Sequence, residues 1–380
     1  MFETHPIKAV LERWNAELPG ARWYVVGGAV RDALLGRPLR DVDVLVAGAP
    51  FDDLMMFLEA RGSVDEAGRT FGVLKFVSRE DGLKLDIALP RREHPAGTGG
   101  YRDVETESDA TMPIEEDLSR RDFTINAMAW EVSSGRLIDP HGGQTDVASK
   151  MIRAVGDPSA RFAEDYTRIL RGLRFAAQLN FEIEWETWKA MLALVPRVDE
   201  TRDGQRLVPH ELISRELLKS FEADPVRTAD LWQEAGLTSV LMPELGEWPE
   251  RVRGALDRLT EEDAVRVIGD VIPMKIVFGL SIAHLGADRA ADIVERLKCV
   301  SAGSGIDATF VRRLAAGGDV SLYKELGLKP LLEGETAMKL LGIAPGPDVG
   351  RALDLLLDAQ AKGMVSSPEE AEVFLKENFI

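Results

Sequence analysis

The strongest constraint on the fold is a change of hydrophobic pattern near residue 150. Before it, short alternating or wholly apolar runs predict β-strands, because alternation places every second side chain on one face of a sheet. These runs are 23–26, 41–46, 71–78 and 83–89, and a helix is predicted over 51–61. The first 150 residues therefore predict an α/β head.

The second part of the chain is dominated by segments with a 3.6-residue period, which is typical of amphipathic helices. They are 162–179, 187–194, 209–221, 225–235, 250–259, 274–285 and 287–297, and the pattern continues to residue 379. No strand pattern of comparable strength follows residue 150. We therefore expect an all-helical remainder behind the head.

Residues 90–112 contain few apolar side chains and include the run Pro-Ala-Gly-Thr-Gly-Gly at 95–100. We expect a long mobile loop here. Loops of this length are usually functional or disordered.

Composition sets broad limits on the class of protein. The chain has 380 residues, of which 45% are hydrophobic and 29% charged, so it can bury sizeable cores. Its single cysteine, Cys299, excludes an internal disulfide and a cysteine-based zinc site. Neither a signal core nor a run of eighteen apolar residues is found, so no membrane association and a cytoplasmic location are expected.

The net charge of −18 argues against nucleic-acid binding, because phosphate contacts need Lys and Arg. The distribution of charge matters more than its sum, however. Arginines gather at 153, 161, 168, 171 and 174. A local basic groove on an acidic protein is thus compatible with this sequence, and so is the absence of any nucleic-acid partner.

The first candidate site is the segment that runs from Gly27 and Gly28 to Arg31, between a predicted strand and a helix. Paired glycines let a phosphate approach the backbone, and Arg31 adds a charged donor. A purely structural turn is the alternative.

The second candidate is Asp41 with Asp43. On a strand, residues two apart point to the same face, so the two carboxylates repel unless a cation lies between them. Mg²⁺ prefers one or two carboxylates together with substrate phosphates, and two ions hold the attacking and the leaving oxygen of a displacement. Asp86, on a later strand, is a possible third carboxylate, with a solvent-facing position as the alternative.

The third candidate is the run at 120–127, which contains Arg121, Asp122 and Asn126. It combines cations suited to a triphosphate with polar groups able to bind a ribose. The alternative is the charged first turn of a helix.

The fourth candidate lies on the predicted helix at 162–179, where Asp165 and Arg168 are three residues apart and so share a face. Cytosine and adenine both present an exocyclic amine beside an unprotonated ring nitrogen. A carboxylate accepts from the amine and a guanidinium donates to the nitrogen, whereas uracil and guanine present the reverse pattern. Such a pair can select C and A, although a surface ion pair is the plain alternative.

Together these segments resemble the class II tRNA nucleotidyltransferase and bacterial poly(A) polymerase family. The matching text is GGAVRDALLG, DVDVLV, RRDFTINAMAW, DPHGGQTD and EDYTRILRGLRFAAQLNF, in this order. Residues 341–350 and 363–367 resemble the tail of its bacterial CCA-adding branch.

The resemblance implies an α+β head, with a nucleotidyltransferase-type mixed β-sheet and flanking helices, followed by an all-α neck, body and tail. The expected boundaries are a catalytic head at 1–150, a neck with the base-reading helix at 151–215, a body at 216–320 and a tRNA-binding tail at 321–380.

It also implies the roles of the site. Asp41 and Asp43 are expected to be catalytic and to bind two Mg²⁺ ions. Asp86 is a possible further ligand only from its place on a later strand, and the resemblance does not imply it. The expected nucleotide-binding residues are Gly27, Gly28, Arg31, Arg121, Asp122, Asn126, Asp165, Arg168 and Arg171. The substrates would be CTP and ATP, and the partner the acceptor end of tRNA.

Two segments depart from the family pattern. The family has a Glu-Arg pair after the base-reading helix, but residues 209–216 here read PHELISRE. Residues 278–296 resemble a phosphohydrolase region, yet His284 is followed by Leu285 rather than Asp, so no phosphohydrolase activity is expected.

Addition of the full CCA end is the favoured activity, because the family's CC-only members have a shortened loop before the Arg-Arg-Asp segment and residues 90–112 are long. A-only addition and poly(A) synthesis follow in that order. A non-catalytic RNA-binding relative is disfavoured by the intact Asp41 and Asp43. A small-molecule nucleotidyltransferase is disfavoured by some two hundred residues of predicted helix.

Overall fold

A computed structural model describes residues 2, 5–39, 42–65, 73–100, 103–243, 287–297, 308–316, 320–325, 329–361, 364–365 and 367–379. Asp41, His284, Cys299 and the predicted helices at 250–259 and 274–285 lie outside these residues. The chain divides into two compact units, Met1–Gly172 with Leu179–Leu194, and Leu173–Gln178 with Val195–Ile380.

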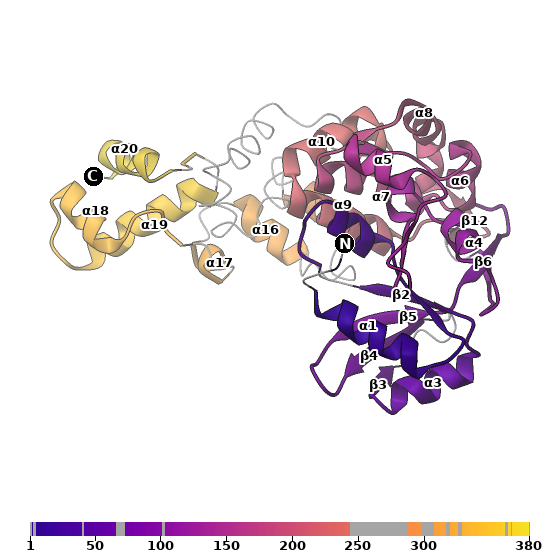
Figure 1. Cartoon of the computed structure of the whole chain (residues 1–380). Coiled ribbons are helices and arrows are strands. Elements are labelled where there is room, and N and C mark those ends of the chain that lie inside the picture. Colours follow the sequence, from indigo (N-terminus) through magenta and orange to yellow (C-terminus); the bar gives the residue numbers. More distant parts are fainter. Residues whose placement is uncertain are drawn as a thin grey trace. The chain divides into compact units, whose positions relative to one another are not determined.

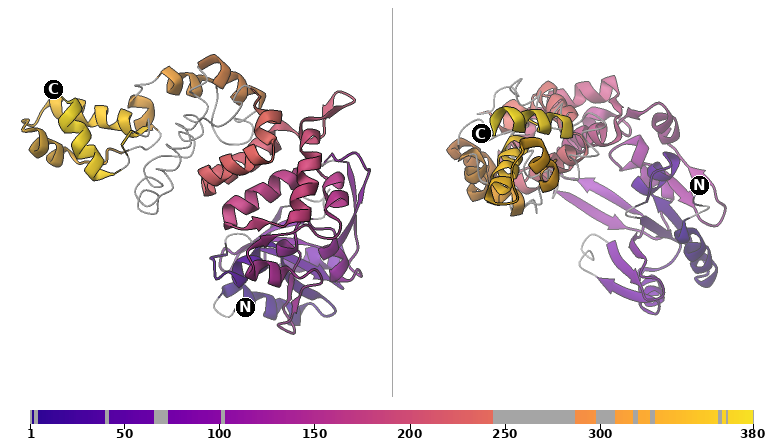
Figure 2. Two further views of the ribbon diagram at one scale, coloured as in Figure 1. Left: turned by 90° about the horizontal axis from the view of Figure 1, so that it is seen from above. Right: turned by 90° about the vertical axis from the view of Figure 1, so that its left-hand side faces the viewer.

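The first unit is built on a seven-stranded sheet in the order β3-β4-β5-β2-β1-β8-β9. Its strands are β1 (Arg22–Val26), β2 (Asp43–Ala47), β3 (Gly62–Asp65), β4 (Val73–Ser78), β5 (Lys84–Ala88), β8 (Ala129–Glu131) and β9 (Leu137–Ile138). The β2–β5 pair is parallel and the other pairs are antiparallel, which confirms the expected mixed sheet. The indigo and purple arrows in the right-hand view of Figure 2 show part of it.

One face of the sheet carries an aromatic cluster. Trp14 of α1 (Pro6–Glu17) contacts Trp23, Phe76 and Phe57, the last from α3 (Phe51–Glu59), with ring centroids 5.3–5.9 Å apart. Both helices lie beside the strands in Figure 1. Such tilted and edge-on pairs are favourable beyond their buried area.

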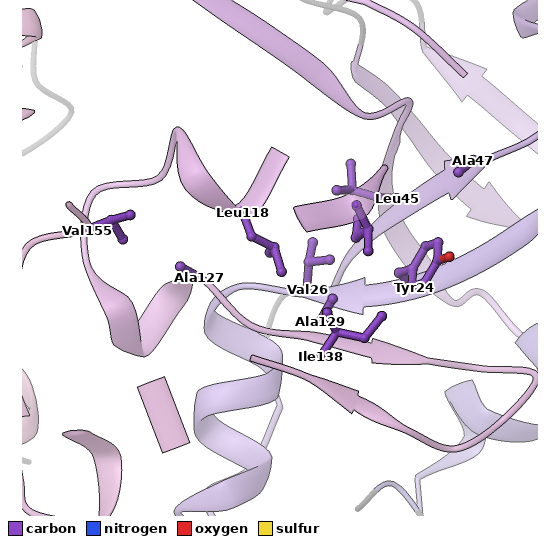
Figure 3. Packing of buried hydrophobic residues seen from close by; sticks show 10 residues of the cluster. Tyr24, Val26, Leu45, Ala47, Leu118, Ala127, Ala129, Ile138 and Val155 are labelled. Carbon is purple, nitrogen blue, oxygen red and sulfur yellow. The ribbon is translucent and has the colours of Figure 1, made fainter. Parts of the chain in front are cut away.

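The opposite face packs against α4 (Ile114–Ser119). Tyr24, Val26 and Leu45 point from β1 and β2 toward Leu118, and all four side chains are buried (Figure 3). Because side chains alternate along a strand, this same face carries Asp43 at the end of β2. The packing of α4 thus brings the segment after it close to Asp43.

The expectation of a loop at 90–112 is wrong in part, because this segment contains a β-hairpin. β6 (Arg91–Pro95) pairs antiparallel with β7 (Val104–Ser108). Nearly all of its side chains are polar, so the periodicity of buried apolar residues that predicts strands is missing. Asp109 N donates to Pro90 O at 2.9 Å and closes its base.

The single helix expected at 162–179 is also wrong, because it is interrupted. α6 (Pro158–Glu164) ends at Asp165, whose backbone is extended, with φ of −157°. α7 (Thr167–Leu179) then begins with Thr167 N donating to Asp165 Oδ1 at 2.9 Å. Asp favours such caps because its side chain satisfies an amide that has no partner within the helix.

The remaining described helices confirm a mostly helical second part. They include α8 (Trp185–Leu194), α9 (His210–Ala223), α10 (Pro225–Glu234), α11 (Leu237–Leu241), α15 (Ala287–Arg296), α16 (Ala308–Ala316) and α17 (Val320–Glu325). The expectation of an entirely helical remainder needs a small correction. Two-residue strands pair as β10 (Met151–Ile152) with β11 (Glu182–Ile183) and β12 (Thr201–Arg202) with β13 (Gln205–Arg206).

The last helices, α18 (Gly334–Leu341), α19 (Pro347–Ala361) and α20 (Pro368–Asn378), form a small core of their own and are yellow in Figure 1. The cluster contains Leu332, Ala337, Ala352, Leu356, Ala359, Val365, Ala371 and Leu375, all buried. Among the described helices, none has the length and apolar character needed to cross a bilayer.

The hairpin loop docks through Gly99, which gives a test. Tyr166 N donates to Gly99 O at 3.0 Å, and a Cβ at Gly99 would lie 2.2 Å from the Tyr166 ring. Gly99→Ala should release the loop and speed hydrogen–deuterium exchange of the Tyr166 amide by about tenfold or more.

Gly97→Ala is the matched control, because Gly97 also has a positive φ but nothing within 4 Å of its Cβ position. It should leave that exchange rate near the wild-type value. Equal exchange in wild type and Gly99→Ala would contradict the docking.

Candidate nucleotide and metal site

A glycine turn at the end of β1 forms the centre of the candidate site. Gly27 follows Val26 with φ of +67°, and α2 (Gly28–Leu34) begins directly after it, as the sequence predicts. A Cβ at Gly27 would lie 2.9 Å from Arg121 Nη1 and 3.7 Å from Asp43 Oδ2. Both the positive φ and this crowding favour glycine.

Asp43 and Asp86 lie side by side at this edge of the sheet. They are register partners on the parallel strands β2 and β5, so their side chains share a face, and Asp43 is exposed. Lys75 Nζ lies 3.4 Å from Asp86 Oδ2. The Asp86 side chain is thus partly exposed to solvent and forms an ion pair with Lys75. Among the described residues, from which Asp41 is absent, no three His, Cys, Asp or Glu side chains are placed so that they could hold a metal ion together.

Arg31 and Arg121 approach the same residue from two sides. Arg31 Nη1 donates to Asn126 Oδ1 at 2.7 Å, and Arg121 Nη1 donates to the carbonyl oxygen of Asn126 at 3.3 Å. Arg31 and Asn126 are both buried. The charged residues of this run lie between the end of α4 at Ser119 and a 3₁₀ helix at Thr124–Asn126, so they precede a short helical turn.

Asp122 joins this cluster to α7. Its Oδ2 accepts from Arg171 Nε at 2.7 Å, and its Oδ1 accepts from Phe123 N and, at 3.4 Å, from Asn126 Nδ2. Burial raises the pKa of Asp122, but the charge of Arg171 and these hydrogen bonds outweigh it and lower the pKa to about 2. Asp122 is therefore a permanent anion at neutral pH.

Asp165 and Arg168 are close in sequence but do not share a helical face. Asp165 lies in the break before α7, whereas Arg168 lies in its first turn. The Arg168 guanidinium donates to Glu164 Oε2 at 2.6 Å and to the carbonyl oxygens of Arg161 and Arg120. The alternative, a surface ion pair between Asp165 and Arg168, is wrong, since Arg168 pairs with Glu164 and Glu93.

The Asp165 carboxylate uses one oxygen for the cap of α7. Its Oδ1 accepts from Thr167 N at 2.9 Å and from Thr167 Oγ1 at 2.7 Å. Burial raises the pKa of Asp165 above its ordinary value, although Thr167, Arg168 and Arg171 oppose this rise. By exposed area the residue is half-buried, so its carboxylate can accept further hydrogen bonds.

Three acidic residues near the site were not predicted. Asp117, which is fully buried, accepts from both Arg120 and Arg121. Glu93 of β6 forms ion pairs with Arg120 and Arg168, and Glu164 pairs with Arg168. One signal was available for Asp117, since it precedes the two arginines by three and four residues, the spacing at which side chains meet on a helix.

The segment at 209–216, which departs from the Glu-Arg pattern of the family, contributes Glu216 to a different ion pair. Arg174 Nε donates to Glu216 Oε2 at 2.5 Å, and both residues are buried. A buried, fully paired charge of this kind is costly to break.

Residues 23–153 match the family model described as the poly A polymerase head domain. The chain is 35% identical over 263 residues to a CCA-adding enzyme of Streptococcus suis, covering 67% of this chain and 58% of that protein. It is 39% identical over 223 residues to a multifunctional CCA protein of Nitrosococcus oceani, covering 58% of this chain and 50% of that protein. The chain thus spans about half the length of the curated relatives it matches.

Solved structures give the same fold over nearly the whole chain. A tRNA-processing enzyme in its apo form I has a TM-score of 0.66 and 25% identity, covering 98% of this chain and 90% of that one. A Thermotoga maritima CCA-adding enzyme complexed with tRNA has a TM-score of 0.59 and 23% identity, covering 98% and 95%.

The depressed pKa of Asp122 predicts a pH effect on stability. Because its pKa is lower in the folded state, the stabilisation is complete above the unfolded value near 4 and is lost as pH falls toward about 2. Asp122→Asn should lower the free energy of unfolding at pH 7 by about 2 kcal/mol or more, a difference that shrinks between about pH 4 and pH 2.

Denaturant unfolding at several pH values measures this difference. Asp53→Asn, which changes an exposed carboxylate of α3, is the control and should leave stability nearly unchanged. A difference between wild type and Asp122→Asn that does not vary with pH would contradict the assignment.

Proposed function

Because residues 23–153 match the poly A polymerase head domain and the chain is similar to CCA-adding enzymes, we propose that it is a class II tRNA nucleotidyltransferase that adds C, C and A to the 3′ end of tRNA. It would use CTP and ATP, need no template and release pyrophosphate. The observation that carries the proposal is the convergence of Asp43, Gly27 and Arg121 within one cluster. A carboxylate, an open backbone turn and a guanidinium are the groups that nucleotidyl transfer needs.

We propose that Asp41 and Asp43 hold two Mg²⁺ ions. The donors fit, because Asp43 is exposed beside Gly27 and has a second carboxylate, Asp86, as its register neighbour. Bound ions would supply charge stabilisation for the attacking 3′-hydroxyl and the leaving pyrophosphate. Asp86 is the weaker ligand, since Lys75 already neutralises it.

The triphosphate would lie against the turn formed by Gly27 and Gly28. The absence of side chains there lets phosphate oxygens approach the backbone, and Arg121 lies within reach of Gly27. Arg31 holds Asn126 from the other side. These residues orient the phosphates and place positive charge where negative charge develops.

The ribose and base would lie between this cluster and the start of α7. Asp122 fixes Asn126 and Arg171 and so shapes the ribose side of the site. Asp165 would accept from the amine of C or A, and Arg168 would donate to the adjacent ring nitrogen. For this, the Arg168 guanidinium must exchange some of its contacts with Glu164 for the base.

Residues 1–150, 151–215, 216–320 and 321–380 remain our proposed head, neck, body and tail. The acceptor end of tRNA is the proposed partner, and a cytoplasmic location goes with that proposal. A-only addition is the second candidate activity. The length of residues 90–112 disfavours CC-only addition, and their hairpin contributes Glu93 to the base-reading end of the site.

An incorporation assay tests the activity. Purified chain, Mg²⁺, CTP and ATP are mixed with tRNA ending before CCA, and product length and base order are determined. Full CCA addition is expected, and Asp43→Asn should reduce the rate by on the order of a hundredfold or more, as when preorganised charge stabilisation is removed.

Asp65→Asn is the control, since Asp65 is also an exposed carboxylate at the end of a strand of this sheet. It should retain the wild-type rate. Absence of incorporation by wild type, or an unaltered rate in Asp43→Asn, would exclude the proposed function. Addition of A alone would select the second candidate.

Base selection is tested separately through Arg168. Arg168→Ala should raise incorporation of UTP and GTP relative to CTP and ATP by about tenfold or more, because the ring N–H of uracil or guanine then no longer faces the donor groups of the guanidinium. Incorporation of each single nucleotide is measured against wild type. Undiminished exclusion of UTP and GTP would refute this role for Arg168.

A further inference from the structure

Asp117 is a charged residue buried in the packing of α4. Its side chain is fully buried, yet both oxygens are used. Oδ1 accepts from Arg120 Nε at 2.9 Å and Nη2 at 2.8 Å, and from Arg91 N at 3.2 Å. Oδ2 accepts from Arg121 Nη2 at 3.1 Å and Nε at 3.3 Å.

A buried ion cluster of this kind is seldom the most stable solution. Well-packed apolar residues of similar volume are often equally stabilising, because charges lose their hydration on burial. The neighbours Ile114 and Leu118 already supply the apolar contacts between α4 and the sheet. The carboxylate is therefore best explained by the two arginines that it holds.

The two arginines lead to opposite ends of the proposed nucleotide site. Arg121 Nη1 extends to the glycine turn, 2.9 Å from the Cβ position of Gly27. Arg120 pairs with Glu93 of the hairpin, and the second oxygen of Glu93 lies 3.5 Å from Arg168 Nη2. Asp117 is thus the branch point of an ion-pair chain that runs from the phosphate side to the base side.

We propose that Asp117 is a positioning residue that fixes Arg121 for the triphosphate and, through Arg120 and Glu93, fixes Arg168 for the base. This role rests on the proposed function. Asp117 touches neither substrate nor reacting atoms and acts only through the arginines. The same carboxylate therefore affects nucleotide affinity and base choice together.

The charge state of the group agrees with this role. Burial raises the pKa of Asp117, but the charges of Arg121 and Arg120 outweigh burial and lower it below the ordinary value. The carboxylate remains ionised while it holds both guanidinium groups.

Asp117→Asn tests the proposal with little change in shape. It keeps one acceptor oxygen and removes the charge that both arginines share. We expect the KM for CTP and ATP to rise by about tenfold to a hundredfold, the range for losing a charge-assisted hydrogen bond. Incorporation of UTP and GTP relative to CTP should rise in the same variant.

Glu184→Gln is the matched control. Glu184 also accepts from a backbone amide, Thr187 N at 2.8 Å, and pairs with an arginine, Arg153 at 3.4 Å. Neither partner belongs to the proposed site. Glu184→Gln should lower thermal stability while keeping the wild-type KM and base choice, which separates loss of stability from loss of positioning.

A double-mutant cycle with Arg121→Ala identifies the route of action. If Asp117 acts on the triphosphate through Arg121, Asp117→Asn adds little to the KM defect of Arg121→Ala. Additive defects would overturn the positioning role. A normal KM and normal base choice in Asp117→Asn would overturn it as well, whatever happens to stability.

Direct CTP binding distinguishes failure of this inference from failure of the proposed function. Calorimetric titration of the full chain with CTP and Mg²⁺ needs no tRNA. Weaker CTP binding in Asp117→Asn supports the inference even if wild type adds no nucleotide. Absence of incorporation by wild type would exclude only the proposed function. Equal CTP binding beside normal incorporation overturns the inference and retains the function.

Discussion

The strand register around β2 is the constraint on which the site depends. Asp43 is opposite Val26 on β1 and beside Asp86 on β5, so one backbone pairing fixes both carboxylates and the glycine that follows Val26. A shift by one residue would turn Asp43 to the aromatic face. Packing of the opposite face by Leu118 excludes that shift, because the apolar residues would then lose their partners.

From this fixed edge, alternating charges extend through the first unit. Each arginine that reaches the proposed site is held by a carboxylate or a carbonyl group, as in Arg171 with Asp122 and Arg121 with Asp117. Such pairing offsets the loss of hydration that burial imposes on each charge. It also leaves each guanidinium with a defined direction before any substrate arrives, which lowers the cost of ordering it on binding.

Much of the head could be predicted from sequence, because its strands alternate or are wholly apolar. Asp43 and the glycine turn were candidates from their residue types and spacing, and the structure places Asp43 Oδ2 3.7 Å from the Cβ position of Gly27. The hairpin of β6 and β7 could not be predicted, since polar strands lack a buried face. The helix break at Asp165 was missed because the spacing of apolar residues continues across it. The backbone amide of Thr167 donates to the Asp165 side chain there, and a sequence pattern does not show this hydrogen bond. Partners distant in sequence, such as Glu93 and Arg168, have no local signature.

The burial of Asp165 has a consequence for how bases would be rejected. A carboxylate whose pKa is raised by burial lacks part of its hydration, so its charge is already destabilised before binding. A donated amine relieves this destabilisation, whereas a carbonyl oxygen in the same place adds repulsion. Discrimination would then come less from strong attraction for the right base than from the desolvation cost of the carboxylate, which only the right base offsets. A site of this kind can bind its substrate loosely, release its product readily and still exclude the wrong partner.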